Sequence, residues 1–178
     1  MPRVEVDRSL PPVVLPVRIV SELLGHARET LPEECCGLLV GGAGQRYQRL
    51  VRCRNEMTQR HRADPIAYPR DGRAAFWMNE ADQMHTREEA EAAGERVTAV
   101  YHSHVGTGAY LSEMDLDYAG HAFFPFPDAD QIVVAVASPD ASHLGMRLED
   151  GCAQDIGVFD WDAAAAVFRG RRVRPSAS

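Results

Sequence analysis

The sequence feature that most restricts the possible folds of this chain is a short, continuous apolar run that ends in two glycines, CCGLLVGG at 35–42. Such a run is typical of a central strand that is buried on both faces. The next run, RYQRLVRCRNE at 46–56, alternates in character and is expected to pair with the first strand as a hairpin. The pattern therefore indicates a sheet that other elements must cover.

The rest of the chain alternates between helix-like and strand-like periodicities. Further strands are expected at 13–17, 96–104, 131–139, 142–150 and 155–162, helices at 18–31, 73–94 and 112–122, loops at 56–71 and 105–111, and a helical turn at 163–170. No repeat or low-complexity linker divides the pattern, so we predict one α/β domain over 12–168, with a mixed sheet flanked by helices. Residues 1–11 are expected to be a loose leader and 169–178 a frayed, basic tail.

The composition argues against several classes of protein. A chain of 178 residues that is 45% apolar suits one globular domain with its own core. A net charge of -7 and the absence of a basic run in the body argue against a nucleic-acid-binding protein. No apolar stretch approaches the roughly 18 to 20 residues that cross a bilayer, and MPRVEVDRSLPP lacks the apolar core of a signal peptide. We therefore expect a cytoplasmic protein with no membrane partner.

The four cysteines include no CxxC pair, so neither a zinc ribbon nor a thioredoxin-like redox motif is present. We interpret them as reduced, mostly buried thiols. Cys35 and Cys36 flank the buried run, which favours small core residues over one half of a Cys/His nucleophile pair.

Two histidines lie on the strand predicted at 96–104. His102 and His104 are two residues apart, and because strand side chains alternate, both imidazoles are expected on the same face. A glycine-containing loop then leads to Ser112 and Asp115 at the start of the next helix. Two imidazoles and a carboxylate leave the fourth tetrahedral position of a zinc ion open, as in catalytic rather than structural zinc sites. Ser112 followed by Asp115 also suits a helix N-cap with an acidic third residue, and both roles can coexist.

A hydrolase that works at neutral pH also needs a base near the metal. Glu34 and Glu33 directly precede the buried run, where a carboxylate at the end of a central strand can project into a site. Without further context, exposed turn charges after Pro32 are the more common explanation for such a pair. Spacing alone does not choose between the two glutamates.

Taken together, PEECCGLLVGG at 32–42 and YHSHVGTGAYLSEMDLDYA at 101–119 resemble the JAMM (MPN+) metallopeptidases. The pattern of that family is a glutamate two residues before a Cys-Gly pair and a strand, followed by HxHx7SxxD. Val105 departs from it, because relatives usually carry proline there, and 56–71 matches little. Neither departure removes a candidate ligand. The resemblance implies a single MPN domain with a curved mixed sheet, similar to the cytidine-deaminase fold.

On this alignment Glu34, not Glu33, falls on the catalytic acid/base, and Ser112 falls on the serine that stabilises the oxyanion. The zinc ligands would be His102, His104 and Asp115. The resemblance implies hydrolysis of a peptide or isopeptide bond after the Gly-Gly tail of a ubiquitin-like protein, with a zinc-bound water activated by the glutamate. Small stand-alone bacterial members resemble peptidases that process sulfur-carrier proteins.

Two other functions stay open at this point. The ligands and base do not themselves select a peptide bond, so a metal-dependent hydrolase of a small molecule or phosphoester is one alternative. A non-catalytic MPN-type scaffold is another, although such scaffolds lack the ligands that this chain retains. A zinc deaminase is disfavoured because its HxE and PCxxC elements are missing.

Overall fold

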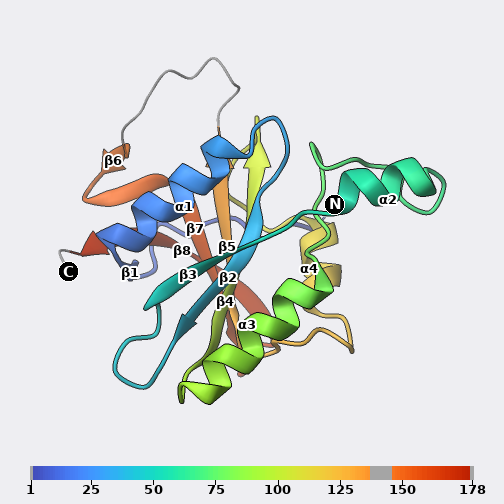
Figure 1. The fold of residues 1–178 in the computed structure, drawn as a ribbon. Coiled ribbons are helices and arrows are strands. Elements are labelled where there is room, and N and C mark those ends of the chain that lie inside the picture. The colour runs from blue at the N-terminus through green and yellow to red at the C-terminus, as the bar shows by residue number, and fades with distance from the viewer. Residues whose placement is uncertain (1, 137–145, 177–178) are drawn as a thin grey trace.

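The computed structural model describes residues 2–136 and 146–176 and shows one curved, mixed sheet with helices on both sides (Figure 1). The strands are β1 (Val13–Pro16), β2 (Cys36–Gly41), β3 (Arg49–Cys53), β4 (Arg96–Val105), β5 (Asp130–Val136), β6 (Leu148–Glu149), β7 (Cys152–Asp162) and β8 (Val167–Ser176). The helices are α1 (Val17–Glu29), α2 (Met57–Ala63), α3 (Glu80–Ala92) and α4 (Glu113–Ala119). The predicted α/β class with a mixed sheet is confirmed.

The strand that carries the two histidines, β4, lies inside the sheet. The strand order is β1-β8-β7-β5-β4-β2-β3, and β6 pairs with β7. β2 is antiparallel to both β3 and β4, so the predicted hairpin is confirmed. β4 and β5 are parallel, and a parallel pair requires a crossover, which contains α4. That crossover brings the start of α4 back to the end of β4.

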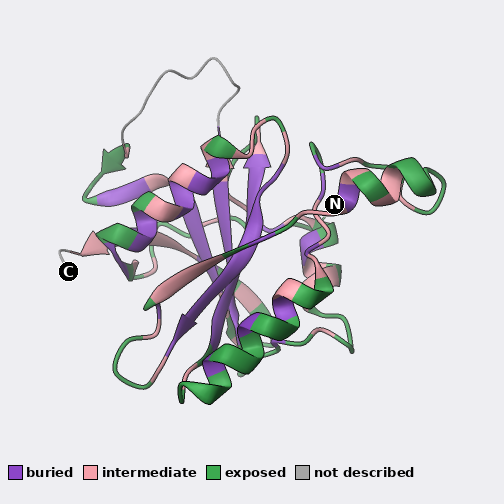
Figure 2. Cartoon of the chain, in the orientation of Figure 1, coloured by how far each residue is buried: buried purple, intermediate pink, exposed green. Residues whose placement is uncertain are grey.

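Each face of the sheet packs against a different helix, because alternate residues of a buried strand point to opposite faces. Leu39, Ala99 and Ile132 belong to the core under α1. Leu38 and Val100, their neighbours along the strands, belong to the core on the α3 side. Figure 2 shows the resulting layers, with buried central strands and helices whose outer surfaces are exposed.

Two predictions between β3 and β4 are corrected by the structure. The helix expected at 73–94 begins only at Glu80, because the residues before it continue the sheet hydrogen bonding beyond β3, where Asn55 forms a β-bridge with Met78. The segment expected to be a loop, 56–71, contains α2. A helix of seven residues is too short for a periodic apolar face, so the sequence carried no clear signal for it.

The structure also corrects the prediction for the C-terminal residues. Instead of a helical turn at 163–170 and a frayed tail at 169–178, β7 and β8 form an antiparallel pair. Two arginines of β8 form ion pairs with carboxylates of β7: Arg171 with Asp160 at 2.8 Å and Arg169 with Asp162 at 2.6 Å. Val173 on the same strand is fully buried. Cross-strand charge pairing therefore makes an arginine-rich strand compatible with the sheet.

The N-terminal residues expected to be a loose leader, 1–11, contact the body of the protein at two points. Val4 forms an antiparallel bridge with Leu111, and Val6 forms a parallel bridge with Gly170. Both valines pack against a small buried cluster under that part of the sheet. The expectation of a loose segment is wrong for these residues, whereas the domain bounds stay a prediction.

Two of the predicted strands lie partly outside the described residues. The strands expected at 131–139 and 142–150 extend into 137–145, which the structure does not describe; β5 and β6 represent the described parts. Within 2–136 and 146–176, no helix combines the length and the apolar composition that crossing a bilayer requires.

Gly37, in the middle of β2, is expected to tolerate no side chain. A Cβ atom there would lie 2.4 Å from the carbonyl oxygen of Val51 and 2.5 Å from the ring of Tyr101. We expect Gly37→Ala to lower the free energy of unfolding by about 1–3 kcal/mol, because a packed core resists added atoms. Urea unfolding measures this effect. Gly42→Ala, where a Cβ would contact nothing within 4 Å, is the control and should change stability far less.

Candidate metal centre

His102 and His104 lie at the carboxyl end of β4, on the face that packs towards α3 and α4. Val100 precedes them with the same alternation and belongs to the core on that side. Both imidazoles are buried, with 1% and 7% of the residue surface exposed. Their Nε2 atoms are 3.2 Å apart. The two imidazoles therefore lie on the same face of the sheet, as their spacing of two residues predicts.

The third member of the cluster, Asp115, is buried in the first turn of α4. Its Oδ1 is 3.2 Å from Nε2 of His102, and its Oδ2 is 3.4 Å from Nε2 of His104. Ser112 is the N-cap of the helix, and its backbone N–H and its hydroxyl both donate to Asp115 Oδ2 at 2.7 Å. The capping interaction thus holds the carboxylate towards the strand. The N-cap interpretation of Ser112 is correct.

The electrostatics of Asp115 favour an ionised carboxylate. Burial acts to raise its pKa, but the neighbouring His102 and the hydrogen bonds from His102, His104 and Ser112 hold that pKa well below its usual range. The same carboxylate raises the pKa of His104, against the effect of burial. A permanently charged oxygen beside two imidazole nitrogens is the donor set that a divalent transition metal prefers.

The three donor groups have the spacing of a tetrahedral metal site. Their ligand atoms all lie within 4.8 Å of one another, and the contacts between them measure 3.2, 3.2 and 3.4 Å. A tetrahedron with zinc-to-ligand distances of about 2.0–2.1 Å has edges of about 3.3–3.4 Å. Nδ1 of His104 lies 3.1 Å from the carbonyl oxygen of Gly108, which suits the tautomer that leaves Nε2 free to bind a metal. The residues therefore fit a metal ion.

Aromatic rings that the sequence analysis did not identify orient the two imidazoles. Phe76 stacks on His102 with ring centroids 4.6 Å apart, and Tyr110 packs edge-on against His104 at 4.9 Å. Nδ1 of His102 is buried without a hydrogen-bond partner among the described residues, so ring stacking holds this imidazole in place. Neither aromatic residue has a local spacing to the histidines that would have revealed its role.

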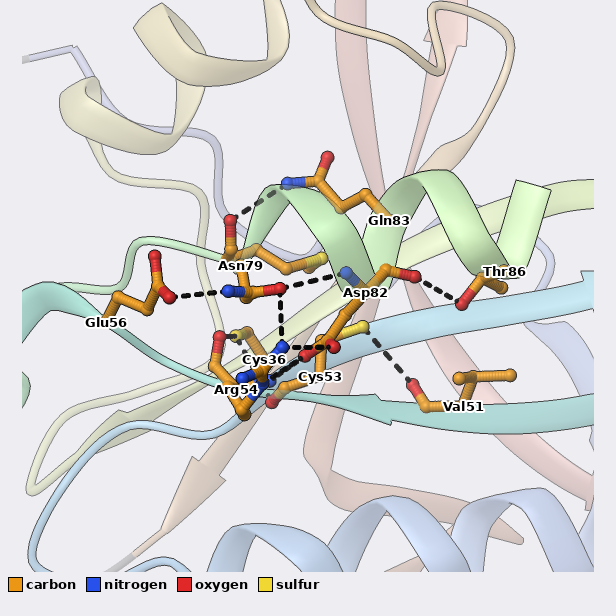
Figure 3. Close-up of polar contacts among 10 residues, drawn as sticks. Cys36, Val51, Cys53, Arg54, Glu56, Asn79, Asp82, Gln83 and Thr86 are labelled. Atoms are coloured by element: carbon orange, nitrogen blue, oxygen red, sulfur yellow. Dashed lines mark hydrogen bonds and ion pairs between the residues drawn. The ribbon is translucent and has the colours of Figure 1, made fainter. Parts of the chain in front are cut away.

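The segment that carries Phe76 is tied to β3 and α3 by a polar network (Figure 3). Asn79 caps α3 by accepting a hydrogen bond from the backbone N–H of Asp82 at 2.9 Å. Arg54, just after β3, donates to both of these side chains at 2.9 Å, and Glu56 accepts from the Asn79 amide. The network therefore fixes the approach of this segment to the metal centre.

Glu34 reaches the cluster because of the register between β2 and β4. Cys36 pairs with His102, so two residues earlier the chain lies opposite His104. The backbone of Glu34 is held on both sides, since its N–H donates to the carbonyl oxygen of Gly72 at 2.7 Å and its own carbonyl accepts from the Asn55 amide at 3.0 Å. The carboxyl is buried against the site, with 6% of the residue exposed.

The charge environment of Glu34 suits a group that exchanges protons near neutral pH. Burial raises its pKa to about 7, the two imidazoles act to lower it, and Asp115 acts to raise it. A bound divalent cation would act in the lowering direction. A base with a pKa close to the working pH is the most effective proton carrier.

The rival glutamate, Glu33, points to a different part of the molecule. Its carboxylate accepts a hydrogen bond from the hydroxyl of Thr58 at 2.7 Å, in α2. A Cβ atom on Gly72 would also contact this carboxylate. Glu33 therefore supports the segment between β3 and α3, while Glu34 faces the histidines.

The cysteines behave as core residues. All four are free and buried, as expected. Burial raises the pKa of Cys35 to about 12 and that of Cys36 well above its usual range. Neither thiol forms the thiolate that a nucleophile requires.

Two members of the cluster, His104 and Asp115, line a cleft of about 1080 Å³. Among the cleft residues are Glu34, His104, Ser112 and Asp115, together with many apolar and aromatic side chains: Tyr68, Phe76, Trp77, Tyr110, Tyr118, Phe123, Phe124 and Phe126. His121 also lines the cleft. An open, largely apolar cleft with a few convergent polar groups has the character of a binding site.

Comparisons with known proteins agree with this geometry. The family model for prokaryotic homologs of the JAB domain matches residues 16–145, a segment that contains every candidate site residue. Proteins named CysO-cysteine peptidase from Mycobacterium bovis and Mycobacterium tuberculosis are 26% identical over 147 residues, covering 82% of this chain and 89% of theirs. The solution structure of a Desulfitobacterium hafniense protein aligns with a TM-score of 0.59 and 18% identity over 93% of both chains. That last likeness concerns the fold alone.

Proposed function

The chain belongs to the family of prokaryotic homologs of the JAB domain, and we propose that it is a zinc metallopeptidase that cleaves the bond after the Gly-Gly tail of a ubiquitin-like or sulfur-carrier protein. The observation that carries the proposal is the convergence of His102, His104 and Asp115 beside the buried Glu34, in an open cleft. The CysO-cysteine peptidases support a peptide bond as the target and a carrier as the partner.

Glu34 is the proton carrier in the proposed reaction. A zinc ion held by the two histidines and the aspartate would lower the pKa of a bound water molecule and polarise the scissile carbonyl. Glu34 accepts the proton of the attacking water and returns it to the leaving amine nitrogen, which departs as a neutral amine. Both transfers suit a buried carboxyl whose pKa burial raises to about 7.

Ser112 is the candidate donor to the carbonyl oxygen as negative charge develops there. In the structure its hydroxyl donates to Asp115 Oδ2, so its proton is already used. To act on the substrate, the hydroxyl rotates towards the carbonyl oxygen. The backbone N–H of Ser112 continues to donate to the same carboxylate oxygen at 2.7 Å and keeps Asp115 in place.

The burial of the proposed ligands favours a substrate with small side chains next to the scissile bond. His104 and Asp115 are each 7% exposed, and His102 is 1% exposed. A scissile bond flanked by large side chains would collide with the aromatic lining before it reached them. Glycine residues carry no side chain, so a Gly-Gly tail brings its backbone close to the site.

The proposal is tested by incubating zinc-loaded protein with ubiquitin-fold carriers that bear short C-terminal extensions after Gly-Gly. We expect mass spectrometry to show loss of the extension, no loss after treatment with a chelator, and recovery when zinc is restored. Carriers with Ala-Ala in place of Gly-Gly should be cleaved at least about tenfold more slowly, since each methyl group obstructs the approach.

A complete lack of chelator-sensitive cleavage would show that the peptidase proposal is wrong. The small-molecule hydrolase would then be the better candidate if metal-dependent turnover of another ester or amide appeared. A protein that binds zinc but turns over no substrate would point to the scaffold function.

A further inference from the structure

Residues 3–8, which precede the segment that the family model matches, lie against the loop between β4 and α4 (106–112). Val4 and Leu111 form two hydrogen bonds there, because the backbone N–H of each residue donates to the carbonyl oxygen of the other at 3.0 Å. We call residues 3–8 the N-terminal strap. The strap therefore contacts the loop that joins the two elements carrying the proposed metal ligands.

This loop carries the groups that orient His104 and Asp115. The carbonyl oxygen of Gly108 lies 3.1 Å from Nδ1 of His104, and the ring of Tyr110 packs against the same imidazole. At the end of the loop, Ser112 donates to Asp115 Oδ2 through its backbone N–H and through its hydroxyl. A shift of the loop would therefore disturb two of the three proposed ligands.

The loop has little hydrogen bonding of its own. Gly106 adopts a positive φ of 74°, and Gly108 is a second glycine two residues later. For residues 107–111, the only backbone–backbone hydrogen bonds within the described part of the chain are the two to Val4. Glycine-containing segments without such bonds keep much conformational freedom, and freedom left in the loop must be lost when a metal binds. The strap removes part of this freedom beforehand.

A second contact between the strap and the loop runs through Tyr110. The guanidinium carbon of Arg3 lies 4.7 Å from the centroid of the Tyr110 ring. That ring packs edge-on against His104, with centroids 4.9 Å apart. Because a cation over the face of an aromatic ring is attracted to it, the ring is confined between the strap and one of the proposed ligands.

The strap is also anchored to β8. The N–H of Asp7 donates to the carbonyl oxygen of Gly170 at 2.9 Å, and Val6 forms a β-bridge with the same glycine. A Cβ atom on Gly170 would lie 2.3 Å from the carbonyl oxygen of Glu5, so glycine is required for this close approach. Val4 and Val6 add apolar packing against a buried cluster. The strap therefore connects a central part of β8 to the loop beside the metal centre.

We propose that the N-terminal strap positions this loop, so that His104 and Asp115 are held in the geometry that binds zinc before the ion arrives. Val4 is the main positioning residue, since both backbone hydrogen bonds to the loop are its own. The inference rests on the proposed metal centre and on no particular substrate. Groups that support metal ligands commonly contribute about 10- to 100-fold to metal affinity. The strap acts through such groups, so we expect an effect at the lower end of that range.

The test replaces Val4 by proline, which removes the N–H that donates to Leu111. The zinc dissociation constant of the full chain is measured without denaturant, by competition with a chromophoric chelator. We expect Val4→Pro to bind zinc about tenfold more weakly, because the loop must then be ordered as the ion binds. The absorption spectrum of the cobalt-substituted protein should also change, since it reports the arrangement of ligands around the ion.

Glu5→Pro is the matched control. It introduces the same residue one position later, at an exposed residue whose N–H forms no hydrogen bond within residues 2–136 and 146–176. Val4 already lies in a β-bridge, and an extended conformation is what proline favours in the residue before it. The variant loses the ion pair with Arg3, but exposed ion pairs contribute little, so zinc affinity should change by less than about twofold.

Hydrogen exchange and urea unfolding separate positioning from a purely structural role. In metal-free protein, the Leu111 amide should exchange faster in Val4→Pro than in Glu5→Pro. A strap that only stabilises the fold would lower the urea midpoint and leave the zinc dissociation constant of the folded protein unchanged. If Val4→Pro does not fold, Val4→Ala replaces it. That variant shortens a side chain that packs in the same cluster as Leu111, and it should weaken zinc binding by at least about threefold.

The outcomes separate the strap from the metal centre. An unchanged zinc dissociation constant in the folded Val4 variant, or an equal loss of affinity in Glu5→Pro, would overturn the positioning role of the strap. Failure of the unmodified protein to bind zinc would instead count against the metal centre and the proposed function.

Discussion

Replacing Glu34 by glutamine is expected to abolish turnover while the protein keeps its zinc. Glutamine has nearly the same shape but neither accepts nor delivers a proton, and general acid–base catalysis contributes about 10²- to 10⁴-fold to a reaction rate. Because Glu34 serves both proton transfers in the proposed mechanism, we expect a loss at the upper end of that range. The three proposed ligands are untouched, so zinc measured by atomic spectroscopy should stay at one ion per chain.

The neighbouring glutamate provides the matched control for this substitution. Glu33→Gln makes the same chemical change one residue earlier, at a carboxylate that hydrogen bonds to Thr58 rather than facing the histidines. It should keep most of the activity. A Glu34→Gln protein with full activity, or an inactive Glu33→Gln protein with normal zinc content, would show that the proton carrier is assigned to the wrong residue.

The same substitution has a second readout in metal-free protein. The pKa of Glu34 is about 7 in the folded state, above the usual value of 4.5, so the folded protein holds a proton that the unfolded chain releases. Stability therefore falls as pH rises between about 4.5 and 7. The Glu34→Gln protein lacks this group, and its unfolding free energy, measured by urea titration, should decline less over that interval.

Replacing His104 by alanine is expected to remove both zinc and activity. The imidazole is one of the three proposed ligands, and its loss leaves two donors, which is insufficient for a stable catalytic zinc site. We expect zinc content below about one tenth of an ion per chain after dialysis, and cleavage of carrier substrates at the level of the chelator-treated protein. The contrast with Glu34→Gln separates loss of the metal from loss of the proton carrier.

His85→Ala controls for the removal of a histidine. His85 is an exposed residue of α3 that pairs with Glu89 on the same helix, and it is not among the residues that line the cleft. This variant should bind zinc and cleave substrate normally. A His104→Ala protein with stoichiometric zinc and unchanged turnover would mean that the metal, if one is bound, lies elsewhere.

Local spacing was sufficient to predict the metal cluster because each half of it belongs to one regular element. Side chains two residues apart on a strand point to the same face of the sheet, as those of His102 and His104 do. Ser112 and Asp115 are held by the geometry of one helix N-terminus. The end of β4 and the start of α4 then meet because a short loop and a parallel crossover join them.

The choice of the base required information that spacing does not contain. Adjacent residues before a strand look equivalent in sequence, whereas the pairing of Cys36 with His102 directs Glu34 to the cluster. The family resemblance selected the same residue. The aromatic supports, Phe76 and Tyr110, come from segments with no fixed spacing to their histidines, so sequence periodicity could not identify them.

The two ends of the chain are another case in which the structure depends on tertiary contacts and not on a local sequence pattern. Residues 2–11 and β8 carry no apolar periodicity that distinguishes them from mobile segments, and their structure depends on contacts with distant strands. Arg171 fits into a sheet only because Asp160 lies opposite on β7. Such pairings depend on the register between strands, which a linear pattern does not specify.

The sequence by itself determined the α/β class, the buried hairpin and the three candidate metal ligands, since these depend on periodicities of two and about 3.6 residues within single elements. Only the tertiary structure showed that Glu34 rather than Glu33 lies against the metal cluster, and which rings hold the imidazoles. Those features depend on strand register and on packing between segments that are distant in the chain, and no local pattern encodes them.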